Sequence, residues 1–276
     1  MYEVLEVSLG NLTRLYDYVQ RNLYRAKFGL KGFDNPWMVE SHPWKANETV
    51  LDVGAAYSIF PSYLHDSYGC EVWAVDDFGQ TVDDPFWERS SSPPEFIKTH
   101  PGVKYVLERL GDPQTSSLPA GYFDVIYSIS VLEHIPQTIT PAVWKHIDAL
   151  LKPGGVLLHA VDVFFPSNGG LKKVLAGWVF DGLYAILPER LRIRYCFATP
   201  QSYVRLAFQS LGIPTRARGG FSTSPLKALN VWNMVLNPDI LTEDYNHGLN
   251  RIVKDKMKGY KYQRAGSLLI KLRKTG

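Results

Sequence analysis

A glycine turn between two acidic residues is the first group that could do chemistry. In VLDVGAAYSIFP, Val50–Pro61, Asp52 stands ahead of Gly54, and EVWAVDD reaches Asp76 22 residues after Gly54. Glycine lets the backbone approach a ligand, and the next helix begins with N–H groups aimed into the same space. An acid at the end of the second strand can accept hydrogen bonds from both hydroxyls of a ribose. The spacing predicts a nucleoside site, shared by NAD and other adenosine-containing ligands.

The same turn lacks the glycines of a phosphate-binding loop. Dinucleotide-binding folds use G-x-G-x-x-G, whereas this chain has G-A-A-Y-S with no third glycine. An ordinary strand-to-helix loop, with Asp76 and Asp77 at a solvated strand end, is the alternative. If Ala56 adopts a positive φ, the strain is on the order of 1 kcal/mol relative to glycine.

Candidates for acid–base chemistry follow two later strand-like segments. His134, beside Glu133 in SVLEHIP, comes just after YFDVIYSISV, and its imidazole can take a proton near neutral pH. The alternative is an acid–histidine pair that only orders the loop. Asp162, late in VLLHAVDVFF, is the second candidate for a base or substrate contact. His159 lies an odd number of residues away and is predicted to be a core residue on the opposite face.

Composition narrows the class of protein. The 276 residues are 45% hydrophobic and 21% charged with a net charge of +3, which is ordinary for a globular protein. The two cysteines, Cys70 and Cys196, give neither a disulfide scaffold nor a metal cluster, so no metal is predicted. Neither a signal peptide nor a membrane span is evident, and a cytoplasmic setting is the expectation.

Strand-like and helix-like segments alternate from Val50 onward, which favours a doubly wound α/β fold with a mostly parallel sheet. Helices are expected over FPSYLHDSYG, closed by Gly69, and over TPAVWKHIDALLKPGG, with Thr140 as its cap, Pro141 in its first turn and glycines at its exit. A further helix is expected from Thr199. The predicted strands are TVLDVG, EVWAVD, VKYVLERLGD, YFDVIYSISV, VLLHAVDVFF and a terminal GSLLIKLRK.

Two regions stand outside this pattern. Residues 1–49 form an N-terminal helical extension or cap, with an amphipathic helix expected over Leu9–Phe28, and residues 50–276 form the main domain. An insert at 164–198 follows the fifth strand, either as a cap over the site or as a helix on a membrane surface. Its aromatic residues suit an apolar or ring-bearing small molecule, although they could equally fill a core; they are Phe164, Phe165, Trp178, Phe180 and Tyr184.

Several motifs in order over about Val50–Gly155 resemble the class I, seven-stranded S-adenosylmethionine-dependent methyltransferases. VLDVGAAYS resembles the nucleoside-binding loop, VWAVD the segment with the ribose acid, and LLKPGG the turn before the fifth strand. The resemblance implies S-adenosyl-L-methionine as cofactor and a terminal antiparallel strand inside a seven-stranded sheet. It also implies a set of cofactor-binding residues: Asp52, Gly54, Ala55, Ala56, Tyr57, Asp76, Asp77, Asp112 near the adenine amine, Ser128, Ser130 and Glu133.

The sequence therefore predicts methyl transfer to a small-molecule, sugar or lipid-linked acceptor, with oxygen as the favoured atom. Nucleic acid is not expected, because the fourth strand lacks the Asn/Asp-Pro-Pro-aromatic turn that holds a flipped base. The basic RIVKDKMKGYKYQR is then a solvated helical face. A nicotinamide-dependent oxidoreductase or epimerase and a non-catalytic cofactor-binding module are the alternatives. The acceptor, any dependence on a metal and the oligomeric state are left open.

Overall fold

The computed structural model describes residues 1–5, 31–78, 93–135, 138–166, 207–213 and 262–276. The helix expected over Leu9–Phe28, the start of the helix from Thr199 and most of the 164–198 insert lie outside these residues. The strands are β1 (Tyr2–Val4), β2 (Thr49–Val53), β3 (Glu71–Val75), β4 (Val103–Val106), β5 (Phe123–Ile129), β6 (Leu151–Pro166) and β7 (Tyr262–Lys274). The helices are α2 (Lys31–Ser41), α3 (Phe60–Tyr68), α4 (Pro93–Lys98), α5 (Thr140–Leu150) and the 3₁₀ helix η2 (Leu132–His134).

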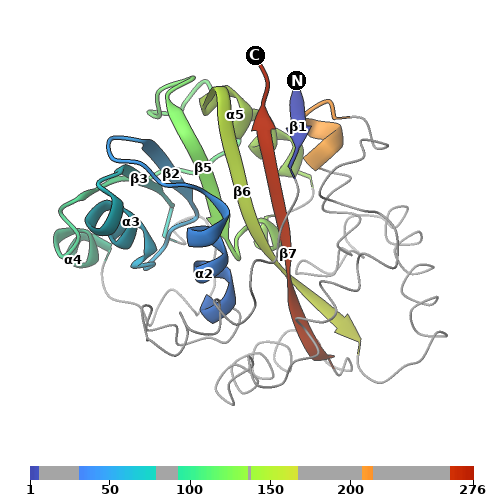
Figure 1. Cartoon of the computed structure of the whole chain (residues 1–276), viewed down its shortest axis with the longest axis horizontal. Coiled ribbons are helices and arrows are strands. Elements are labelled where there is room, and N and C mark those ends of the chain that lie inside the picture. Colours follow the sequence, from blue (N-terminus) through green and yellow to red (C-terminus); the bar gives the residue numbers. More distant parts are fainter. Residues whose placement is uncertain (6–30, 79–92, 136–137, 167–206, 214–261) are drawn as a thin grey trace.

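The strands form one sheet in the order β1-β7-β6-β5-β2-β3-β4 (Figure 1). The pairs β2–β3, β2–β5, β3–β4 and β5–β6 are parallel, whereas β7 is antiparallel to both β6 and β1. The predicted mostly parallel α/β sheet with a terminal antiparallel strand is therefore confirmed. The sequence pattern gave no sign of β1, which pairs with β7 through Tyr2 and Lys274 and brings the two ends of the chain side by side.

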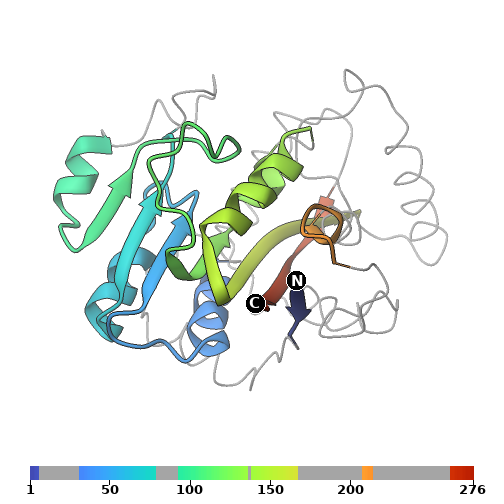
Figure 2. The same cartoon turned by 90° about the horizontal axis from the view of Figure 1, so that it is seen from above.

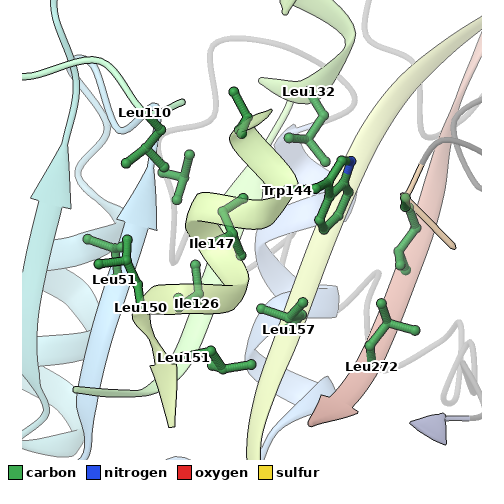
Figure 3. Packing of buried hydrophobic residues seen from close by; sticks show 14 of the residues in the cluster. Leu51, Leu110, Ile126, Leu132, Trp144, Ile147, Leu150, Leu151, Leu157 and Leu272 are labelled. Carbon is green, nitrogen blue, oxygen red and sulfur yellow. The ribbon is translucent and has the colours of Figure 1, made fainter. Parts of the chain in front are cut away.

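Helices cover both faces of the sheet (Figure 2). On one face α5 packs Trp144, Ile147 and Leu150 against Leu51 of β2 and Ile126 of β5 (Figure 3). On the other face α2 and α3 pack against the alternate residues of the same strands. This two-sided burial explains why all five residues of β2 are buried and why the parallel strands have nearly continuous apolar sequences.

The helix boundaries follow local chain chemistry with two corrections. As predicted, α3 ends at Gly69, whose φ of 70° is left-handed and whose N–H donates to the carbonyl of His65. Thr140, however, is the first residue of α5 and not its cap; Ile139 holds the N-cap position without a side-chain hydrogen bond. The expected glycine exit is also wrong, because α5 ends at Leu150 and passes directly into β6.

Candidate functional site

The turn after β2 brings its backbone close to the segment that follows β5. Gly54 has a φ of 73° and its N–H donates to the carbonyl oxygen of Val75, 2.8 Å away. A Cβ on Gly54 would lie 2.4 Å from Cγ1 of Val131. Position 54 therefore needs glycine for two reasons: its φ is left-handed, and a side chain there would clash with Val131. The contact joins the nucleoside loop to η2.

The Asp76 carboxylate joins this loop to the segment that follows β3. Its Oδ2 accepts the backbone N–H of Ala56 at 2.9 Å, and its Oδ1 accepts the backbone N–H of Phe78 at 2.6 Å. Both residues have positive φ, 45° for Ala56 and 49° for Phe78. The strain foreseen for Ala56 is therefore present, and charge-assisted hydrogen bonds to one carboxylate offset it.

Burial controls the electrostatics of Asp76. It raises the pKa of the Asp76 carboxyl, and the hydrogen bonds from Phe78 and Ala56 act in the opposite direction. The neighbouring charge of Asp77 adds to the upward shift. A carboxylate in this partly desolvated setting forms stronger hydrogen bonds than one in water.

Tyr57 stands beside the loop in an aromatic group. Its ring meets Phe78 and Phe96 edge to face, with centroids 5.2 Å apart in each case. Phe96 comes from α4 and also contacts Tyr105 of β4 at 6.1 Å. These two ring contacts hold Tyr57 beside the loop, and Ala55, two residues earlier, is buried in the core.

The segment after β5 carries the predicted acid–histidine pair. Ser130 has a φ of 54° and donates its N–H to the carbonyl of Ala160 at 2.8 Å, which ends the β5 ladder. In η2 the Glu133 side chain is fully buried, whereas 55% of the His134 side chain is exposed. His134 Nε2 lies 3.9 Å from Glu133 Oε1. The pair therefore presents an accessible imidazole backed by a buried acid.

Asp52 and Ser128 lie inside the sheet. Asp52 is 3% exposed, and its carboxylate beside the Tyr127 hydroxyl adds to the upward shift of the Tyr127 pKa, of which burial is the larger cause. Ser128 is fully buried, with its Oγ 2.8 Å from Nδ1 of His159. His159 is also fully buried, as predicted for a core residue.

Two further predicted site residues, Asp112 and Asp162, lie on the loop after β4 and in β6. Asp112 is exposed on the loop after β4, where its Oδ1 accepts the N–H of Gln114 at 3.0 Å. Asp162 belongs to β6 and pairs with Ser267 of β7. Asp77 follows Asp76 directly and is partly exposed. The structure thus joins the turn, Asp76 and Tyr57 into one compact group, while Asp112 stands on a separate loop.

Three residues that the sequence reasoning missed complete this group: Phe78, Val131 and Phe96. Phe78 had a local signal, because an Asp often accepts the backbone N–H two residues later. Val131 and Phe96 had none, since each meets the loop only through tertiary packing.

The sheet is of the doubly wound α/β class, and the Gly54 loop lies at the carboxyl end of β2, where proteins of this class bind nucleosides. A family model described as a methyltransferase domain matches residues 33–197, more than half of the chain. The chain belongs to this family, the class I S-adenosylmethionine-dependent methyltransferases. Family membership decides against the nicotinamide-dependent alternative.

The chain is also similar, at low sequence identity, to solved structures of methyltransferases. Phosphoethanolamine N-methyltransferase 2 of Haemonchus contortus, in complex with S-adenosyl-L-methionine, is 16% identical with a TM-score of 0.48 over 95% of this chain. This chain spans 60% of the length of that protein. Geranyl diphosphate C-methyltransferase of Streptomyces coelicolor A3(2) is 10% identical with a TM-score of 0.47, covering 99% of this chain and 89% of that one. No curated protein sequence matches significantly.

The described residues fit the family's cofactor. A carboxylate has about four lone-pair sites, and backbone N–H groups in the described part of the chain use two of those on Asp76. The two others suit the two hydroxyls of a ribose. Across the described ranges, no group of three or more His, Cys, Asp or Glu could hold a metal ion, and no helix is long and apolar enough to cross a membrane.

Proposed function

We propose that this chain transfers a methyl group from S-adenosyl-L-methionine to an oxygen atom of a small-molecule, sugar or lipid-linked acceptor. One observation carries the proposal: Gly54 packs against Val131, so η2 with its exposed His134 adjoins the nucleoside loop. A base for an acceptor hydroxyl is needed at this edge of the sheet. The division into an extension at 1–49, a methyltransferase domain at 50–276 and a cap at 164–198 is part of the same proposal.

The residues have separate roles in this scheme. Bound S-adenosylmethionine supplies an electrophilic methyl group on a sulfonium. Asp76 holds the ribose hydroxyls, and the Gly54 turn allows the backbone to approach the ligand. The chain then chiefly orients the acceptor.

His134 is the proposed base. Its Nε2 lies 3.9 Å from Oε1 of the buried Glu133. In its neutral form the exposed imidazole would take the proton from the acceptor hydroxyl. Asp162 is a second candidate, for the base or for an acceptor contact.

The cofactor is tested by thermal unfolding with S-adenosylhomocysteine, NAD and NADP in parallel. A ligand that binds only the folded chain adds roughly 2.7 kcal/mol at a hundredfold excess over its Kd. We expect S-adenosylhomocysteine alone to raise Tm. A rise with the nicotinamide ligands alone would refute the proposal.

The chemistry is tested by screening acceptors for release of S-adenosylhomocysteine. His134→Ala is expected to lower kcat by about 10²-fold or more with the cofactor Kd nearly unchanged. His65→Ala, at the opposite end of the sheet beside Cys70, is the control and should keep its turnover. Wild-type turnover in His134→Ala would remove this residue from the mechanism.

A further inference from the structure

The loop after β4 is attached to α5 just before Asp112. The backbone N–H of Gly111 donates to Nδ1 of His146, 3.2 Å away. His146 belongs to α5 and is only 1% exposed. One residue earlier, Leu110 packs into the core cluster that includes Ile147 of α5 (Figure 3). A hydrogen bond and an apolar contact thus fix the loop at consecutive residues.

The remainder of this loop is closed on itself. Glu108 accepts hydrogen bonds from the hydroxyl of Ser116 and from both the N–H and the hydroxyl of Ser117. Asp112 lies between these attachments and is exposed. Its position relative to the sheet therefore depends on where the flanking residues are held, and on the Gly111 side that includes the bond to His146.

We infer that His146 is a positioning residue for cofactor binding, which holds Gly111 and thereby sets Asp112 against the adenine amine of S-adenosylmethionine. The inference rests on the proposed function and on the contact between Asp112 and the adenine that the family resemblance implies. His146 itself touches neither the cofactor nor the acceptor in this scheme. It acts through the loop.

The bond also makes the loop sensitive to acid. A backbone N–H can only donate, so Nδ1 must accept, and the neutral ring must carry its proton on Nε2. Burial lowers the pKa of His146, while the charges of Glu108 and Asp112 act in the opposite direction. Burial thus keeps the ring neutral near pH 7, and protonation of Nδ1 in acid would break the bond.

The other titratable groups around α5 contact different positions of that helix. His159 of β6 stacks edge to face on Trp144, with centroids 4.9 Å apart. Tyr2 of β1 and Lys274 of β7 both bond to Asp148. Within the described residues, Glu108 and Asp112 are the charged groups that shift the His146 pKa.

Two substitutions separate the hydrogen bond from the packing. His146→Asn keeps an acceptor oxygen near the position of Nδ1 and does not titrate, whereas His146→Leu removes the acceptor. At pH 7.5 we expect His146→Leu to bind S-adenosylhomocysteine roughly five- to tenfold more weakly by calorimetry, and His146→Asn to bind within about twofold of wild type. In assays with an acceptor that the enzyme methylates, His146→Leu should have a higher KM for S-adenosylmethionine than wild type. Its kcat at saturating cofactor should equal that of wild type.

The pH profile provides a second readout that a merely structural role would not change. Between pH 7.5 and pH 5, the wild-type affinity should fall more steeply than that of His146→Asn. Protonation of Asp76 weakens cofactor binding equally in both proteins, so its effect cancels when the two pH profiles are compared. The pH comparison needs only wild type and His146→Asn, so it tests the role of His146 even if His146→Leu does not fold.

The outcomes distinguish this inference from the proposed function. Equal binding by His146→Leu and wild type, or equal pH slopes for wild type and His146→Asn, would overturn the role of His146 alone. A wild-type chain that does not bind S-adenosylhomocysteine at all would overturn the proposed function instead.

Discussion

The Asp76 carboxylate joins the nucleoside loop to the segment that follows β3. It accepts the N–H groups of Ala56 and Phe78, two residues with left-handed backbone that are not glycine. In the proposed function the same oxygens also accept hydrogen bonds from the ribose hydroxyls. One side chain therefore orders the loop and would bind the nucleoside, which makes its removal more damaging than the loss of a ligand contact alone.

Asp76→Ala should weaken binding of S-adenosylhomocysteine by about 10²-fold or more, because buried hydrogen bonds to a charged group are lost on both the loop and the ligand sides. It should also lower the free energy of unfolding by about 1–3 kcal/mol, measured by urea titration. Asp66→Ala, at an exposed site on α3, is the matched control. Unchanged calorimetric binding in Asp76→Ala would disprove the ribose assignment.

Ala56 is the second residue with a direct test. Its φ of 45° disfavours any residue with a Cβ, so Ala56→Gly should raise the free energy of unfolding by about 1 kcal/mol. The same change at the buried Ala55 should destabilise the protein. A loss of stability in Ala56→Gly, measured by the same urea titration, would mean that the loop gains from the methyl group.

At the scale of elements, the contact between the nucleoside loop and η2 joins the cofactor side of the site to the acceptor side. The loop is fixed by β2 and β3, and η2 by the end of β5. Gly54 and Val131 are the residues at which these two segments touch. A change there should alter both cofactor binding and turnover.

Gly54→Ala places a methyl group inside the van der Waals radius of Val131 and strains a φ of 73°. It should lower the free energy of unfolding by about 2 kcal/mol or more and weaken cofactor binding. The double change Gly54→Ala with Val131→Ala removes the two shortest contacts but leaves Cβ of residue 131 at 3.1 Å and the strained φ, so it should recover part of the loss. A double-mutant cycle with zero coupling energy would contradict the contact.

At the scale of the whole molecule, buried histidines control stability in acid. Burial lowers the pKa of His159 to about 3, where it bonds Ser128 of β5 and stacks on Trp144 of α5. In the unfolded chain His159 is therefore protonated as the pH falls below about 6.5, whereas in the folded chain it stays neutral until about pH 3. Above pH 6.5 the burial of neutral His159 does not change the free energy of unfolding with pH. Below pH 6.5 the free energy of unfolding decreases as the pH falls toward 3.

The free energy of unfolding should thus fall by up to about 4–5 kcal/mol on this account between pH 6.5 and pH 3. His146 acts in the same direction. The paired change Ser128→Ala with His159→Leu removes both hydrogen-bonding partners and should flatten the pH dependence measured by urea unfolding. Ser128→Ala alone keeps the histidine and should retain the slope. Equal slopes in the double variant and wild type would exclude His159 as the cause.

The sequence by itself determined the features that depend on short stretches of chain. The strand and turn around Gly54, the acid at Asp76, the Gly69 helix end and the succession of elements along the chain from β2 onward follow from local conformational preferences and hydrophobic patterning. The hydrogen bond from the N–H of Phe78 to the Asp76 carboxylate spans only two residues, so local sequence preferences could also have predicted it. The family resemblance added the expected position of β7.

Only the tertiary structure decided which distant residues meet. Gly111 bonds to His146, 35 residues away, Gly54 touches Val131, and β1 pairs with β7 from the opposite end of the chain. No local propensity encodes these contacts, because they depend on how the packed helices and sheet bring surfaces together. For the same reason the burial that shifts the pKa of His146 and His159 could not be read from their neighbours in sequence.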